Sequence, residues 1–191
     1  MNLPNKLSLL RCALTPIFMA CMLIRFPYHY AAALAVFILA SLTDMWDGKI
    51  ARKTGQITNL GKFLDPLADK ALTTAAFICF IVVTSSRSMP WMLMLMLTRE
   101  FMVTSVRFLA AKDGVVVAAS FAGKLKTVMQ MVSIIYMVAL LQLNQMALDK
   151  VFIQISFRIG MIMIWVATAA TVISGIQYVW QLRHYFKETT D

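Results

Sequence analysis

The chain has 191 residues, of which 60% are hydrophobic, and its 18 Lys and Arg against nine Asp and Glu give a formal net charge of +9. So apolar a composition excludes an ordinary soluble domain and is typical of a helical membrane protein. The basic residues are dispersed at the ends of apolar runs, which argues against nucleic-acid binding and favours contact with anionic membrane lipids.

Apolar runs dominate the chain, and a membrane-spanning helix needs about 20 such residues. Six runs approach this length, at about 7–26, 30–48, 65–84, 89–110, 124–143 and 157–180. The connections between them are short, so residues 1–191 are predicted to form a single domain. The sequence therefore predicts an all-α fold, a polytopic membrane bundle of six transmembrane helices.

The Lys and Arg residues are divided unequally between the two ends of these runs. Thirteen of the 18 lie before the first run, between the second and third, between the fourth and fifth, after the sixth, or within the adjoining ends of these runs. The opposite loops and run ends hold only Arg25, Arg87, Lys150 and Arg158, and Arg99 lies inside the fourth run. The positive-inside rule therefore predicts a multi-pass protein of the cell (cytoplasmic) membrane with both termini in the cytoplasm. Charged residues within the runs predict a polar cavity that is open to the cytoplasm.

Most of the charged residues that could bind a metal or take part in catalysis lie where the second run ends and the third begins. This acidic motif consists of Asp44, Asp47, Gly48, Ala51, Arg52, Gly61, Asp65 and Asp69. Positions 47, 48, 51 and 52 follow Asp44 at spacings that share one helix face, and positions 61, 65 and 69 line up along a second helix. Two such helices packed side by side would aim the four carboxylates at one point.

Four carboxylates so close together cannot all ionise without a counter-charge. Oxygen-only ligands suit Mg²⁺ or Mn²⁺, so Asp44, Asp47, Asp65 and Asp69 are predicted to hold two divalent cations. The small residues of the motif leave room for a substrate against helix backbone, and Arg52 adds a planar cation suited to phosphate. A cation transporter is the remote alternative, and no inverted repeat supports it.

The fourth and fifth runs contain a second group of charges. Adjacent helical positions point to different faces, so Arg99 and Glu100 are expected to find separate partners. Arg107, Lys124 and Lys126 lie near the cytoplasmic boundary, and we predict that they bind a phosphate which the metal ions do not touch. Arg99 is a fourth candidate for this role. Anchoring of the bundle at the membrane boundary, or a structural ion pair for Arg99, is the alternative.

The acidic motif resembles the signature of the CDP-alcohol phosphatidyltransferase family, Asp-x2-Asp-Gly-x2-Ala-Arg-x8-Gly-x3-Asp-x3-Asp, at every fixed position. The resemblance implies a homodimeric integral membrane enzyme that transfers the phosphoalkyl part of a CDP-linked donor to an alcohol and releases CMP. It implies catalytic roles for Asp65 and Asp69, with Asp69 accepting the proton of the attacking hydroxyl. The residues expected to bind the donor are Gly48, Ala51, Arg52 and Gly61.

Segments outside the motif resemble the bacterial phosphatidylglycerophosphate synthases of that family. They are Asn2-Leu-Pro-Asn5, Asp65 to Lys70, Arg99-Glu100-Phe101, Gly123 to Thr127 and Ser174-Gly175. The likeness implies CDP-diacylglycerol and sn-glycerol 3-phosphate as substrates, with phosphatidylglycerophosphate and CMP as products. Inositol phosphate, phosphatidylglycerol and serine stay open as acceptors, although a basic cluster favours a phosphorylated acceptor over serine.

Overall fold

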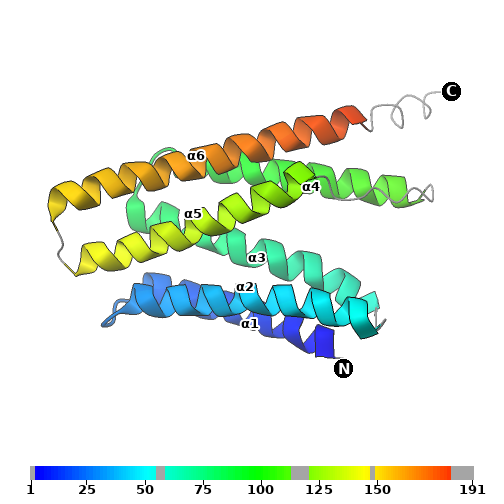
Figure 1. Ribbon diagram of the computed structural model, residues 1–191, viewed down its shortest axis with the longest axis horizontal. Helices are drawn as coiled ribbons and strands as arrows, with labels where there is room; N and C mark the ends of the chain where they lie inside the picture. Colours follow the sequence, from blue (N-terminus) through cyan, green and yellow to red (C-terminus); the bar gives the residue numbers. More distant parts are fainter. Residues whose placement is uncertain (1–2, 55–58, 113–120, 147–148, 182–191) are drawn as a thin grey trace. The chain divides into compact units, whose positions relative to one another are not determined.

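The computed structural model describes residues 3–54, 59–112, 121–146 and 149–181, and this part of the chain forms six α-helices and no strand (Figure 1). Within the helices, the side chains of residues 3–6, 44–54, 59–66, 69, 108–112, 121–122, 124 and 181 lie outside the description. The helices are α1 Leu3–Leu23, α2 His29–Thr54, α3 Asn59–Thr84, α4 Met89–Lys112, α5 Phe121–Gln145 and α6 Lys150–Gln181. The prediction of an all-α fold is confirmed.

Local sequence explains where several of these helices begin. Helix α4 starts at Met89, and Pro90 occupies its first turn, where an N–H group would have no partner within the helix. Asp149 precedes α6, and its Oδ2 accepts a hydrogen bond from the backbone N–H of Phe152 at 3.3 Å. An aspartate at this position is a favoured N-cap because it satisfies an otherwise unpaired N–H group of the first turn.

The helices divide into two structural units, of which unit 1 comprises residues 1–86 and 134–158. It contains α1, α2 and α3 with the last part of α5 and the first part of α6. Helices α1 and α2 are antiparallel (Figure 1), and α1 contacts both α2 and α3. The buried rings of Phe18 and Phe37 join α1 to α2, with centroids 5.7 Å apart. Unit 1 thus carries the helices on which the acidic motif lies.

Unit 2 comprises residues 87–133 and 159–191, which include α4, the first part of α5 and most of α6. Val103 and Val106 of α4 pack against Tyr178 of α6 in its apolar core. Helices α5 and α6 each contribute to both units. The sequence-based expectation of one domain over the whole chain stays a prediction.

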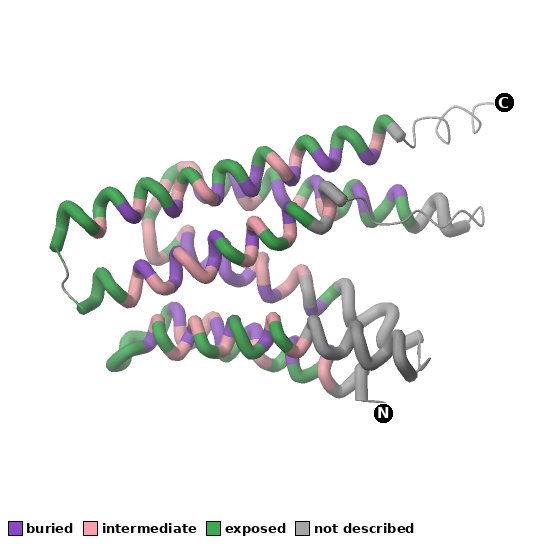
Figure 2. Tube along the Cα trace, in the orientation of Figure 1, coloured by how far each residue is buried: buried purple, intermediate pink, exposed green. Residues whose placement is uncertain are grey.

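The described helices expose apolar residues and bury several charged ones, and Figure 2 shows exposed and buried positions alternating along them. Exposed apolar residues, one for each helix from α1 to α6, are Ile17, Leu39, Val82, Phe101, Val132 and Ile162. By contrast, Arg11, Arg99 and Lys126 are buried. In water such an exterior would be unfavourable, so the helices are suited to an apolar solvent such as the membrane interior.

Length and composition alone identify two candidate membrane spans in the described residues, Leu125–Gln145 and Lys150–Trp180. Shorter apolar helical segments are Leu7–Leu23, His29–Thr43 and Lys70–Thr84. Helix α4 is in neither group, and charged residues at positions 99, 100 and 107 interrupt it. The six-span bundle and its polar cavity therefore stay predictions.

Candidate active site

The acidic motif lies entirely on helical backbone. Its first half occupies the last part of α2 and its second half the first part of α3, and only residues 55–58 separate the two helices. Five residue steps from Thr54 to Asn59 span at most about 18 Å, so the end of α2 and the start of α3, which carry the two halves of the motif, lie close together in unit 1. The prediction that both halves are helical is confirmed, while the side chains of the four aspartates lie outside the described residues.

The register of α2 continues directly into the motif. Its buried residues Ala33, Phe37 and Ala40 repeat at alternating spacings of four and three, which is the pattern of one helix face. Continued at the same spacings, this stripe reaches positions 44, 47 and 51. The backbone therefore places two aspartates and the small Ala51 in line with the face that α2 buries.

In helix α3 the order is reversed, because the motif lies at the start of the helix and the buried stripe follows it. Its buried stripe contains Ala68, Leu72, Ala75 and Cys79. Followed back from Ala68 in steps of three and four, the stripe meets positions 65 and 61. Both halves of the motif thus extend the buried faces of their helices, which is the register a buried oxygen-ligand site requires. Among the described residues there is no group of three His, Cys, Asp or Glu side chains that could hold a metal ion.

Helix α1 brings a buried cation to the same level of unit 1. Arg11 is 1% exposed and shares one face of α1 with the buried Ser8 and Thr15. Arg11 lies twelve residues before Leu23, the last residue of α1. Ser41 lies twelve residues after the first residue of α2. Because α1 and α2 are antiparallel, Arg11 lies level with the residues just before the motif. Arg11 is one of the charged residues within the apolar runs, and the sequence analysis assigned it no role at the site.

Unit 2 contains a buried charge cluster made by Arg99, Glu100, Lys126 and Ser174. The Lys126 ammonium pairs with Glu100 Oε1, and the same oxygen lies 3.3 Å from Arg99 Nη1. The exposed fractions of these side chains are 8% for Arg99, 21% for Glu100 and 7% for Lys126. Two cations share one carboxylate, so the three groups carry a formal charge of +1 in a largely buried environment. A buried charge of this kind is costly unless it is paired.

Helix α6 holds the Arg99 side chain from its other side. Arg99 Nη2 donates to Ser174 Oγ at 3.0 Å, and Ser174 Oγ–H donates to the Thr171 carbonyl at 2.8 Å. A Cβ atom at Gly175 would lie 2.6 Å from Arg99 Cγ, so only glycine leaves room for the arginine stem at that position. Arg99 Nε is buried and has no hydrogen-bond partner in the part of the chain that the structure describes. The guanidinium is therefore held at both terminal nitrogens, while its Nε–H has no acceptor among the described residues.

Arg107 lies two turns further along α4 and has a different partner. Its Nε–H donates to the Tyr178 hydroxyl at 3.0 Å, and its guanidinium carbon lies 5.3 Å from the centroid of the same ring. The Arg107 side chain is exposed, whereas Tyr178 is buried. Tyr178 thus orients a solvent-accessible cation, a role for which the sequence offered no signal beyond the aromatic residue itself.

The cluster corrects one sequence-based expectation and leaves others open. Arg99 and Glu100 do form an ion pair, although they are adjacent in the helix, because both side chains are long enough to turn towards Lys126 and α6. The structure brings Arg99 and Lys126 together through Glu100. The side chain of Lys124 lies outside the described residues. The binding of phosphate to these cations stays a prediction.

Comparison with known proteins gives the family. Residues 1–173 match the model of the CDP-alcohol phosphatidyltransferase family. The chain belongs to this family. The match covers the acidic motif, the charged residues of the cluster on α4 and α5, and α6 as far as residue 173. The family resemblance expected from the motif is therefore confirmed over most of the chain.

Three relatives that share one name are similar to this chain over nearly their whole length. The chain is 42% identical over 189 residues to the CDP-diacylglycerol–glycerol-3-phosphate 3-phosphatidyltransferase of Bacillus subtilis, with 93% of each chain covered. It is 34% identical over 185 residues to the protein of that name from Rickettsia bellii, with 97% of each covered. A third, from Sodalis glossinidius, is 32% identical over 190 residues, with 96% of each covered.

Proposed function

We propose that the protein transfers the phosphatidyl group of CDP-diacylglycerol to sn-glycerol 3-phosphate. The products are phosphatidylglycerophosphate and CMP. The observation that carries the proposal is the acidic motif, of which positions 44, 47, 51, 61 and 65 continue the buried faces of α2 and α3. Similarity to relatives named for this reaction, up to 42% identity over 93% of the chain, supports glycerol 3-phosphate as the acceptor.

The acidic motif is proposed to hold two divalent cations, Mg²⁺ or Mn²⁺, through Asp44, Asp47, Asp65 and Asp69. When bound, they would neutralise the negative charge of the donor diphosphate. The four carboxylates form an all-oxygen ligand set, which suits these metals. Positions 44, 47 and 65 also continue the buried faces of their helices. Arg52 is proposed to bind a donor phosphate, beside the backbone of Gly48, Ala51 and Gly61, whose small size admits the cytidine end.

The chemical step exchanges the phosphoanhydride bond of the donor diphosphate for a phosphate ester bond to the acceptor. The acceptor hydroxyl oxygen bonds to the phosphorus that carries diacylglycerol, and the bond between that phosphorus and the CMP oxygen breaks. The hydroxyl proton passes to the Asp69 carboxylate, and Asp65 lies one helical turn before it. Arg11, buried in α1 at the level of the motif, is proposed to add positive charge as the diphosphate binds.

The acceptor phosphate is proposed to bind to Arg99, Arg107, Lys124 and Lys126. Supporting this role, Arg99 and Lys126 both contact Glu100 Oε1, and Arg99 Nε has no described hydrogen-bond partner. Arg107 supports it too, because Tyr178 orients an exposed guanidinium. Guanidinium groups bind phosphate through paired, charge-assisted hydrogen bonds, so a cluster with an unused donor is chemically suited to this ligand.

We also propose a six-span topology in the cytoplasmic membrane, with both termini and the acidic motif on the cytoplasmic side, and a homodimeric assembly. The unequal distribution of Lys and Arg supports this orientation, and the exposed apolar residues of all six helices support membrane insertion. The acyl chains of the donor would then stay in the bilayer while water-soluble glycerol 3-phosphate and CMP exchange with the cytoplasm.

Release of CMP from CDP-diacylglycerol by the purified protein tests the function. We expect release with glycerol 3-phosphate and Mg²⁺ or Mn²⁺, none with serine, inositol phosphate or phosphatidylglycerol, and none with EDTA. Asp65→Asn should lower turnover by at least about 10²-fold, as for loss of a catalytic group. Asp149→Asn is the matched control, because asparagine also caps helices well. Full activity in excess EDTA would refute the metal site, and release with another acceptor would correct the substrate.

A further inference from the structure

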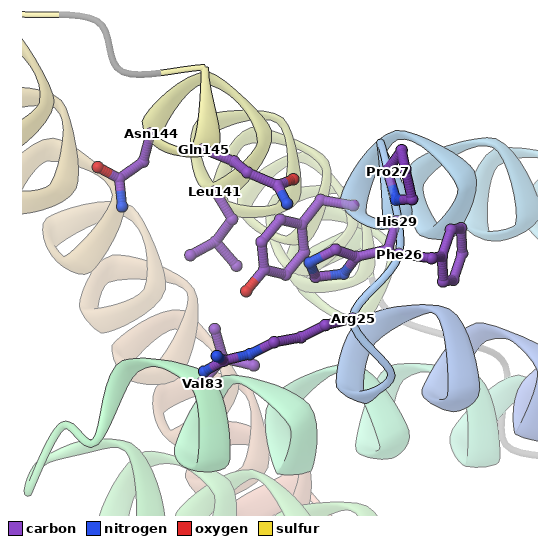
Figure 3. A pocket seen from close by; sticks show the side chains of 9 residues that line it. Arg25, Phe26, Pro27, His29, Val83, Leu141, Asn144 and Gln145 are labelled. Carbon is purple, nitrogen blue, oxygen red and sulfur yellow. The ribbon is translucent and has the colours of Figure 1, made fainter.

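A pocket lies at the end of unit 1 away from the acidic motif, where the α1–α2 turn meets the last turns of α3 and α5 (Figure 3). Its volume is about 550 Å³, which is within the range of small-molecule sites. This turn pocket is lined by Arg25, Phe26, Pro27, His29, Tyr30, Val83, Leu141, Asn144 and Gln145. All of these residues belong to unit 1.

The turn pocket is separate from the acidic motif. It lies at the start of α2 and the end of α3, whereas the motif lies at the end of α2 and the start of α3. Fifteen residues of continuous helix separate His29 from Asp44, which corresponds to about 22 Å at a rise of about 1.5 Å per residue. The pocket therefore does not belong to the proposed catalytic site.

Its chemistry is that of an anion site. Arg25 extends towards Val83, and Asn144 and Gln145 reach the pocket from α5 (Figure 3). The lining contains no carboxylate. Within the described part of the chain, the side chains of Arg25, Asn144 and Gln145 make no hydrogen bond or ion pair, so one cation and two amides are available to a ligand. An arginine with amide neighbours suits a phosphate that carries hydroxyl substituents.

The wall of the turn pocket is held in place by specific contacts. His29 is 4% exposed, and its Nδ1–H donates to the Cys21 carbonyl at 3.0 Å, an assignment that follows because a carbonyl can only accept. The Gln142 side-chain oxygen accepts a hydrogen bond from Ala31 N–H at 2.9 Å, which ties the first turn of α2 to α5. Tyr28, in the turn itself, has a φ of 60°. The cavity is thus formed by the fold before any ligand enters.

Exposed apolar side chains lie close in sequence to the lining residues of the turn pocket. They are Leu23, Ile24, Tyr28, Val82, Leu143 and Met146, and we refer to them as the apolar rim. A polar anion pocket bordered by exposed apolar side chains matches a molecule with an anionic head and hydrocarbon chains. A free anion would gain nothing from the rim.

We propose that the turn pocket binds the anionic headgroup of a phospholipid. The phosphate contacts Arg25, the headgroup hydroxyls contact Asn144 and Gln145, and the acyl chains lie along the apolar rim. This lipid site is distinct from the donor site by its position in α2 and α3. It offers the protein a means of contacting lipid of the same charge class as its proposed product.

Native mass spectrometry of the purified full-length protein in detergent tests the proposal, with dioleoyl phosphatidylglycerol, dioleoyl phosphatidylcholine and inorganic phosphate as probes. Arg25→Gln should weaken phosphatidylglycerol binding roughly tenfold or more, as expected for loss of a charge-assisted hydrogen bond. Arg158→Gln removes an exposed arginine of unit 1 outside the pocket and should have no effect. CMP release should be unchanged in both variants.

A second variant distinguishes weakened lipid binding from a folding defect. Gln145→Glu places a like charge opposite the lipid phosphate while leaving Arg25 intact, and it should weaken phosphatidylglycerol binding by a similar factor. Equal binding in Arg25→Gln and the unaltered protein would overturn the proposal, as would equal losses in Arg25→Gln and Arg158→Gln. Inorganic phosphate that binds through Arg25 as tightly as the lipid would show a free-anion site and overturn the lipid assignment.

Discussion

Gly175 offers the sharpest test of the charge cluster in unit 2. A Cβ atom at this position would lie 2.6 Å from Arg99 Cγ, about 1 Å inside the normal contact distance between carbon atoms. Arg99 cannot move away cheaply, because Glu100 and Ser174 hold its two terminal nitrogens. The clash is with the stem of the side chain, which has little freedom once the end is fixed. Gly175→Ala should therefore force Arg99 out of the cluster or displace α6.

The magnitudes decide the sign of this effect. Overpacking costs about 1–3 kcal/mol, and a lost hydrogen bond to a charged group adds about 1.5–3 kcal/mol. Alanine regains only about 1 kcal/mol of helix propensity over glycine. Gly175→Ala should therefore destabilise the protein by roughly 2–4 kcal/mol. In an Arg99→Ala background the clash is removed, and the nearest remaining contact is Met102 Cε at an ordinary 3.5 Å. There the same substitution should be neutral or slightly stabilising.

Unfolding in mixed micelles, followed by tryptophan fluorescence, would measure the four free energies of this double-mutant cycle. We expect a coupling energy of at least about 2 kcal/mol between positions 99 and 175, which are close enough to interact. Gly175→Ala that destabilises both backgrounds equally would refute the reasoning, because the cost would then lie in the helix backbone and not in the contact with Arg99.

Two further predictions concern the acceptor and the topology. Arg107→Gln and Lys124→Gln should each raise the KM for glycerol 3-phosphate about 10- to 100-fold with little change for CDP-diacylglycerol, since a charge-assisted phosphate contact contributes about 1.5–3 kcal/mol. A fall in thermal stability with an unchanged acceptor KM would instead assign these cations to anchoring. In a chain with its three native cysteines replaced, a cysteine at position 55 should react only from the cytoplasmic side and one at position 148 only from the other. Labelling of both from one side would contradict the six-span topology.

Sequence alone determined the secondary structure and the family. Each apolar run is long enough to form a helix by itself, so six helices could be placed from composition, and the structure confirms them over the residues it describes. Helices α2 and α3 extend beyond the apolar runs because the polar residues of the acidic motif keep helical spacing. The starts of α4 and α6 follow from Pro90 and Asp149, which act on their immediate neighbours. These are local effects, which sequence records directly.

Tertiary structure decided which distant side chains meet. Arg99 depends on Ser174 and Gly175, and Arg107 on Tyr178, across sequence separations of more than 70 residues. Spacing within a helix could not predict these contacts, because they depend on how neighbouring helices pack and rotate. The same limit explains why the ion pair between Arg99 and Glu100 was not expected, although each also has the separate partner that was predicted. Helical periodicity describes where Cβ atoms point, whereas long charged side chains turn towards whatever partner another helix supplies, which here is Lys126.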